Sequence, residues 1–77
     1  MFVEKKIRLN AINDVKEFVN IVSKGCAYDV DVQSGSYIVD GKSLMGIFSL
    51  DLSKTIKVVF HVNSESDIPV ELNKFFI

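Results

Sequence analysis

The sequence contains few of the residues that give small proteins covalent or metal-based stabilisation. Its 77 residues include one cysteine and one histidine. One thiol cannot form a disulfide within the chain, which fits a reducing compartment such as the cytosol. One imidazole and one thiol give no spacing that binds zinc, so we expect no metal site and no cofactor.

An excess of one charge and long apolar runs are missing as well. Nine basic and ten acidic residues leave a net charge of −1, whereas a nucleic-acid-binding protein normally carries a basic excess. No apolar run approaches the roughly 18 residues that a membrane span needs, and the N-terminus has no signal-peptide core. We therefore expect one cytoplasmic domain over residues 1–77, with no nucleic-acid or membrane partner.

Two kinds of apolar periodicity divide the chain. Alternation predicts strands at residues 3–9, 28–33, 37–39 and 55–63. A turn at Ser34-Gly35 is predicted to join the second and third strands, and a turn at Asp40-Gly41 to follow the third. Apolar steps of three and four predict helices at residues 10–24, 43–52 and 68–77. The order β-α-β-β-α-β-α, with strands that are wet on one face, predicts an α+β open-faced sandwich. Its four-stranded antiparallel sheet is covered by helices on one side.

The ends of these helices carry their own signals. Asn10 is the predicted N-cap of the first helix, Asp14 favours its positive first turn, and Gly25 is placed to end it in a left-handed conformation. Pro69 suits the first turn of the last helix. Gly46 costs about 1 kcal/mol relative to alanine, so the second helix is short or depends on tertiary contacts.

The reactive side chains form no recognisable catalytic set. His61 is expected on the solvent face of its strand, as a solvated histidine or as an acid–base or phosphoryl-accepting group; no neighbour is predicted as its partner. Cys26 follows a helix C-terminus, which does not lower a thiol pKa, so it is expected to be structural. Asp29 and Asp31 share a strand face, which favours a solvated sheet edge over a catalytic pair. We expect no enzymatic activity.

The segment Lys42–Leu52 is the most informative part of the sequence. Ser43 precedes an apolar-periodic stretch and is therefore a good N-cap. Met45 and Phe48 are expected partly round the helix, where an exposed Met and Phe form a candidate binding patch. Core filling is the alternative, above all for Phe48. Lys42 supplies a cation that can interact with a phosphate.

This segment, KSLMGIFSLDL, resembles the corresponding part of HPr, the histidine-containing phosphocarrier protein of the bacterial sugar phosphotransferase system. It also resembles Crh, the catabolite-repression paralogue of HPr. The element order, the chain length and the Ser23-Lys24 helix end followed by Tyr28–Val32 agree with that family. The resemblance covers roughly residues 7–62 and implies the HPr-like fold. The predicted partner-binding residues are Lys42, Met45, Gly46 and Phe48.

The chain departs from the family at the phosphocarrier site. Phosphocarrier members begin the first helix with a histidine, a small residue, an arginine and a proline. This chain has Asn10–Val15 there, without histidine, arginine or proline, so phosphorelay from phosphoenolpyruvate through that position is expected to be absent. The remaining possibility for a carrier is a non-standard acceptor, either His61 or Asp14.

The serine of the family motif is retained as Ser43. In the family, an ATP-dependent HPr kinase/phosphorylase modifies this serine, and the product is a corepressor for a LacI-type catabolite control protein. A phosphate adds about −1.5 to −2 charge at the helix start. The resemblance therefore implies a regulatory protein-binding module, with a simple helix cap as the alternative. A structural role as a homodimer through exposed Val59 and Phe75–Ile77 is a third possibility.

Overall fold

The computed structural model describes residues 1–77 as an α+β open-faced sandwich, which confirms the predicted fold class. The strands are β1 (Phe2–Ile7), β2 (Val30–Ser34), β3 (Tyr37–Asp40) and β4 (Ile56–His61). The α-helices are α1 (Ile12–Gly25) and α2 (Leu44–Phe48), and two 3-10 helices follow, η1 (Glu65–Asp67) and η2 (Val70–Phe75). None of these helices has the length and apolar character required to cross a bilayer.

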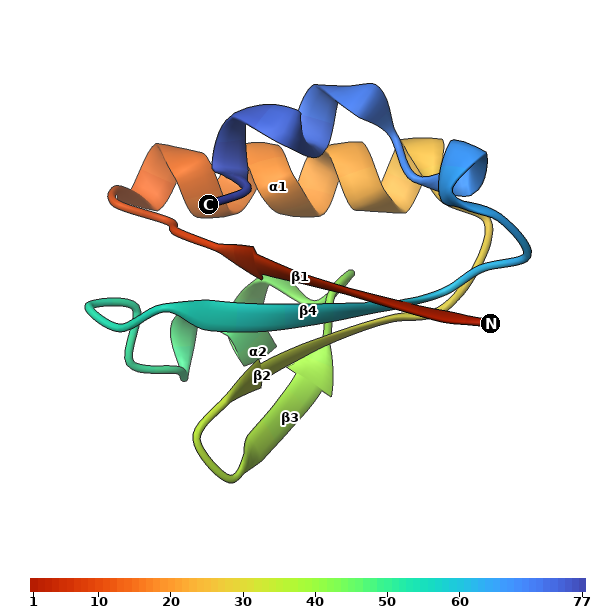
Figure 1. Ribbon diagram of the computed structural model, residues 1–77. Coiled ribbons are helices and arrows are strands. Elements are labelled where there is room, and N and C mark those ends of the chain that lie inside the picture. Colours follow the sequence, from red (N-terminus) through yellow and green to blue (C-terminus); the bar gives the residue numbers. More distant parts are fainter.

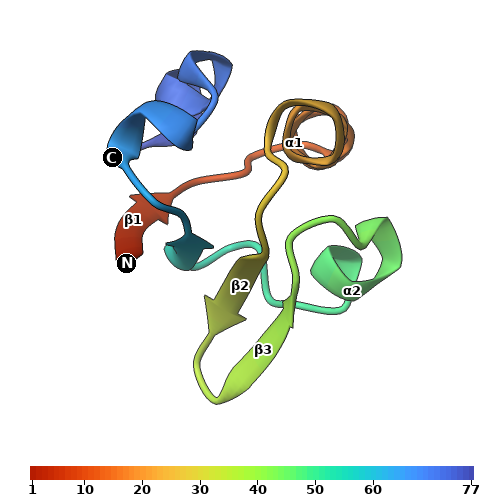
Figure 2. The ribbon, with the colours of Figure 1, turned by 90° about the vertical axis from the view of Figure 1, so that its right-hand side faces the viewer.

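The four strands form one antiparallel sheet in the order β1-β4-β2-β3. Figure 1 shows α1 and the C-terminal segment above this sheet. In the view turned by 90°, α1 and α2 lie on the same side of the sheet and the other face is uncovered (Figure 2). The sheet therefore separates the molecule into a helix side and an open side.

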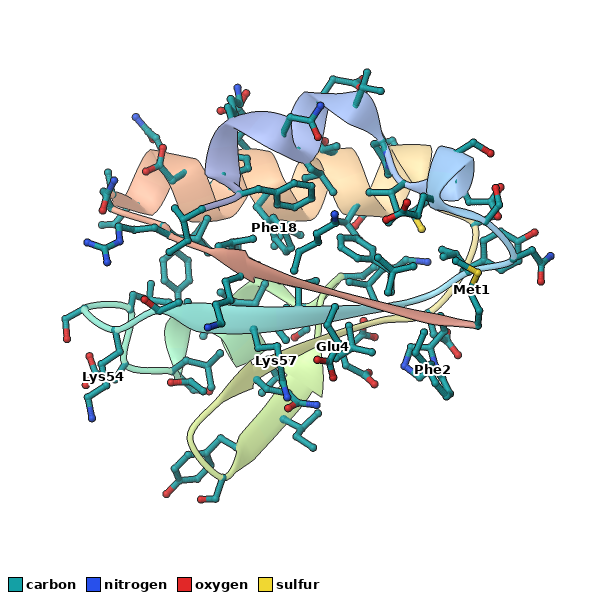
Figure 3. All side chains as sticks on the ribbon, viewed as in Figure 1. Met1, Phe2, Glu4, Phe18, Lys54 and Lys57 are labelled. Carbon is teal, nitrogen blue, oxygen red and sulfur yellow. The ribbon has the colours of Figure 1, made fainter.

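The core lies between the sheet and the helices. The predicted alternation in β4 is confirmed, because Ile56, Val58 and Phe60 are fully buried toward the helices. Phe18 of α1 is equally buried and lies under the middle of that helix (Figure 3). Its ring meets Phe75 edge to face, with the ring centroids 6.1 Å apart. The apolar stripe of α1 and the C-terminal segment therefore share one core.

Both predicted ends of α1 are wrong in detail. Ala11 is the N-cap residue, and the carboxylate of Asp14 accepts the backbone N–H groups of Asn10 (2.9 Å) and Ala11 (3.2 Å). Gly25 belongs to the last turn of the helix, and the capping residue Cys26 is extended. The one residue with positive φ is Gly35, at 59°, which confirms the predicted hairpin turn. Gly25 is instead a point of close approach, since a Cβ there would lie 3.1 Å from the Pro69 side chain.

The helix α2 is shorter than predicted. It ends at Phe48, with Ser49 as its cap, whereas the periodicity extends to Leu52. After it, Asp51 Oδ1 accepts from the backbone N–H (3.1 Å) and the hydroxyl (2.6 Å) of Ser53. Such local side-chain bonds to the backbone favour a turn over a continued helix at residues 51–53.

The C-terminal segment is not the predicted α-helix. Pro69 precedes η2 as its N-cap residue, and the predicted loop at residues 64–67 includes η1. The end of the chain is fixed to the strand region by backbone bonds, from Arg8 N–H to Phe75 C=O and from Ile77 N–H to Lys6 C=O, both 3.0 Å. An extended Phe76 opposite Ile7 is needed for these bonds, so the helix cannot continue to the last residue.

Two of the residues predicted as exposed contacts for a homodimer are buried. Val59 is 9% exposed and Phe75 is 5% exposed. Val59 does lie on the open face, but its register neighbours there are Glu4 and Asp31, whose longer side chains flank it. Of the predicted contacts, Ile77 remains largely exposed.

Candidate functional site

The start of α2 is built around the side chain of Ser43. Its hydroxyl oxygen accepts the backbone N–H of Gly46 at 3.1 Å, which confirms the predicted N-cap. The preceding turn is held by Asp40, whose carbonyl accepts the Ser43 N–H (3.0 Å) and whose carboxylate accepts the Lys42 N–H (2.9 Å). Ser43 is half-buried, so its hydroxyl caps the helix at a position that solvent still reaches.

Gly46 has a packing role at this site. A Cβ at Gly46 would lie 3.0 Å from the Ser43 Oγ and 3.2 Å from the Cβ of Val39. Both distances are tighter than ordinary contacts, so any side chain here would push α2 away from β3 or disturb the cap. The helix-propensity cost of glycine is thus offset by close packing, and its predicted part in partner binding stays a prediction.

The remaining residues of α2 divide between the core and the surface. Ile47 is completely buried and Leu44 is half-buried against the core. Met45 is 78% exposed, and Phe48, three residues later, is half-buried. Residues three apart on a helix are neighbours. Met45 therefore presents an apolar side chain to solvent beside a partly accessible aromatic ring, as predicted, and Lys42 is half-buried at the start of the same helix.

Phe48 also borders a shallow groove between α2 and the loop that leads into α1. Arg8 and Ile12 line this groove on one side and Leu52 on the other. Ile12 is 64% exposed, although the helical periodicity predicted it in the buried stripe. It is the first residue of α1, where the side chain has no preceding turn to pack against. We call Lys42, Ser43, Met45 and Phe48, together with this groove, the Ser43 surface.

The neighbourhood of His61 differs from the prediction. Its Nε2 lies 2.7 Å from Asp31 Oδ2, and its ring meets Phe2 at a centroid distance of 4.8 Å. The pairing of β2 with β4 places Asp31 opposite Val59, one step along the face from His61. His61 therefore has a carboxylate partner that the sequence did not indicate. Both lie on the open face, across the sheet from α2.

Asp29 and Asp31 do not form a solvated sheet edge. The strand β2 lies between β4 and β3, so Asp31 is on an inner strand, opposite Asp40 of β3. No three His, Cys, Asp or Glu side chains are grouped so that they could hold a metal ion. Cys26 is buried, as expected of a structural thiol, with its Sγ 3.8 Å from the Tyr28 carbonyl.

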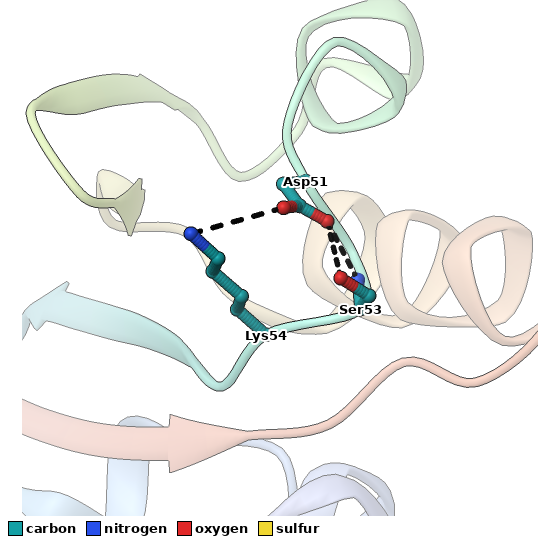
Figure 4. Close-up of polar contacts among 3 residues, drawn as sticks. All are labelled: Asp51, Ser53 and Lys54. Atoms are coloured by element: carbon teal, nitrogen blue, oxygen red, sulfur yellow. Dashed lines mark hydrogen bonds and ion pairs between the residues drawn. The ribbon is translucent and has the colours of Figure 1, made fainter.

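A strongly hydrogen-bonded carboxylate follows the Ser43 surface. The pKa of Asp51 is lowered from its ordinary value of 3.8, chiefly by the hydroxyl of Ser53 and then by the Ser53 N–H; desolvation opposes the shift, and Lys54 makes the smallest contribution to lowering it. Figure 4 shows these three residues, with Lys54 Nζ 4.0 Å from the second carboxylate oxygen. Asp51 is therefore ionised at every pH near neutrality.

Replacing Ser53 by alanine is expected to raise the pKa of Asp51 toward its ordinary value, because the largest of the lowering contacts is removed. The folded-state pKa is below the unfolded one, so ionised Asp51 stabilises the fold above the ordinary value, and this contribution disappears as the pH falls through the folded-state pKa. Carboxyl carbon NMR titration measures the shift. Ser66→Ala is the control, and an unchanged Asp51 titration in Ser53→Ala would contradict the assignment.

Comparison with known proteins identifies no relative of this chain. No protein-family model matches the chain, and neither the curated proteins nor the solved structures contain a match.

Proposed function

We propose that the chain is a regulatory, non-enzymatic domain of the HPr-like type that binds other proteins in the cytoplasm through the Ser43 surface. The observation that carries the proposal is the 78% exposure of Met45, within the motif that resembles HPr and near Ser43, a half-buried residue. Large exposed apolar side chains beside polar groups are typical of protein-binding sites. The proposed partners are an HPr kinase/phosphorylase-like enzyme and a catabolite control regulator-like protein.

Phosphorylation of Ser43 would change this surface without refolding the helix. The Ser43 oxygen that accepts the Gly46 N–H can be replaced in that role by a phosphate oxygen, which is a stronger acceptor. Lys42 is the adjacent cation, while the carboxylate of Asp40 opposes the added charge. Since α2 has only five residues, its dipole contributes little. The main effect is a new negative charge beside Met45, which a partner can recognise.

The surroundings of Asp14 and His61, the two alternative phosphoryl acceptors, support a role without phosphocarrier activity. Asp14 already accepts two backbone N–H groups at the start of α1, so its carboxylate stabilises the helix and is a poor nucleophile. A carrier role for His61 is the second candidate, favoured by the contact with Asp31, which orients its ring. Against it, His61 lies on the open face, on the far side of the sheet from Met45 and Phe48.

Incubation with HPr kinase/phosphorylase and ATP tests the proposal, with intact mass as the measurement. We expect the wild-type protein to gain one phosphoryl group. Ser43→Asn removes the hydroxyl but keeps a good capping side chain, so this variant is expected to remain folded and to gain none. Ser49→Ala, which removes the nearest other hydroxyl of the helix, is expected to behave as wild type.

A parallel incubation with phosphoenolpyruvate and enzyme I tests the carrier alternative. We expect no acid-labile phosphorylation. A label that disappears in His61→Ala would establish His61 as the acceptor and would overturn the inert role. Absence of any phosphoryl transfer from ATP to the wild-type protein, or transfer that persists in Ser43→Asn, would remove Ser43 as a regulatory site.

A further inference from the structure

A polar cleft lies beyond the C-terminal end of α2, separate from the Ser43 surface. Ser34, Ser36 and Tyr37 of the β2–β3 hairpin form one wall, and Ser49, Asp51 and Lys54 of the segment after α2 form the other. Its volume is about 420 Å³, within the range of small-molecule sites. Serines, Asp51 and Lys54 make up most of its lining residues.

Ser34 is the one buried polar residue of the protein, with 9% of its surface exposed. It continues the inward-facing row of β2 after Val30 and Val32, where an apolar side chain would be expected. Its hydroxyl has no hydrogen-bond partner in the chain and reaches solvent through the cleft. Because this hydroxyl opens onto the cleft and has no partner in the chain, its hydrogen bonds go to water or to a molecule bound there.

The opposite wall supplies further hydrogen-bonding groups. Oδ1 of Asp51 is occupied by Ser53, whereas Oδ2 faces only Lys54 at 4.0 Å. The hydroxyl of Ser49 donates to the Gly46 carbonyl at 2.5 Å, so its oxygen remains an acceptor. Lys54 is largely exposed and adds ammonium donors. The cleft thus offers both donors and acceptors.

The charge and the aromatic content of the cleft define the ligand class. The charges of one carboxylate and one ammonium group cancel. An anionic ligand would be repelled by Asp51 and a cationic ligand by Lys54, so a neutral ligand is favoured. Tyr37 is 71% exposed and presents a ring face with a hydroxyl at its tip. These features match a molecule that carries several hydroxyl groups on an apolar carbon frame.

We propose that this cleft binds a neutral polyhydroxylated small molecule, a sugar or a polyol, through Ser34, Ser49 and Asp51 with its carbon frame on Tyr37. The ligand hydroxyls donate to Asp51 and exchange hydrogen bonds with the two serines. The cleft and the Ser43 surface share no lining residue.

Titration of the isotopically labelled protein with myo-inositol and with D-glucose, followed by backbone amide NMR, tests the proposal. We expect saturable shifts at residues 34–37 and 49–54 for at least one of them. Ser34→Ala keeps the apolar packing and removes the hydroxyl that opens onto the cleft, and is expected to weaken binding about threefold to tenfold. Ser66→Ala, whose hydroxyl lies outside the cleft, is expected to bind as wild type.

Shifts that do not saturate for either compound, or that fall outside these two segments, would overturn the proposal. Saturable binding with equal affinity in Ser34→Ala would overturn it as well, since the Ser34 hydroxyl would then contribute nothing to binding. Inorganic phosphate serves as the charged probe, and tighter binding of phosphate than of either neutral compound would also overturn the proposal.

Discussion

Replacing Phe18 by alanine is expected to lower the free energy of unfolding by about 3–5 kcal/mol. Phe18 of α1 is completely buried in the core between this helix and the sheet, where its ring contacts Phe75. A domain of 77 residues has a total stability of roughly 4–12 kcal/mol at the usual values per residue. The variant is therefore expected to keep little of its stability, because no second core exists to compensate.

Chemical denaturation measures this loss, and Phe2→Ala is the matched control. Phe2 is 71% exposed on the open face, where it contacts His61, so its removal is expected to cost well under about 1 kcal/mol. If the two variants lost similar stability, the core would not lie between α1 and the sheet. Figure 3 labels both side chains and shows their different surroundings.

The face that each strand residue takes was predictable from alternation alone. In β4 the residues predicted to face inward are all fully buried, because a period of two fixes the face whatever the strand order. How well the open face is covered was not predictable. Val59 is 9% exposed there because strand pairing sets Glu4 and Asp31 beside it. The sequence of one strand does not show which strands will pair with it.

The same limit applies to polar partners. The contact between His61 and Asp31 joins residues that are 30 positions apart in the sequence, and it exists only because β2 lies next to β4. Helix ends failed for a different reason. The carboxylate of Asp14 reaches back to the N–H groups of Asn10 and Ala11, so α1 begins after Ala11 and Asn10 is left outside the helix.

The Ser43 surface was predictable in part. The cap at Ser43 and the exposure of Met45 follow from local spacing, because a serine before an apolar turn and a residue off the apolar stripe need no tertiary information. The contribution of Arg8 and Ile12 was not predictable, since the β1–α1 loop comes near Phe48 only in the folded chain. The best available signal was the position of Ile12 at the first turn of its helix.

Replacing Leu72 by alanine is expected to lower the free energy of unfolding by about 2–5 kcal/mol. A loss of this size would show that the C-terminal segment folds together with the rest of the domain. Leu72 is completely buried although it lies on a single short 3-10 helix. Such a helix has little stability of its own. Its geometry is maintained by the burial of Leu72 and Phe75 and by the backbone bonds that join Phe75 and Ile77 to the end of β1.

Val70→Ala is the matched control, since Val70 lies in the same 3-10 helix and is 74% exposed. We expect this control to change stability by less than about 0.5 kcal/mol. Amide exchange gives an independent readout, because Arg8 N–H and Ile77 N–H bond across the junction and are expected to lose protection in Leu72→Ala. Equal costs for the two variants, with protection retained, would mean that the segment only rests on a core that is complete without it. The edge-to-face contact of Phe75 with Phe18 argues that the core needs it.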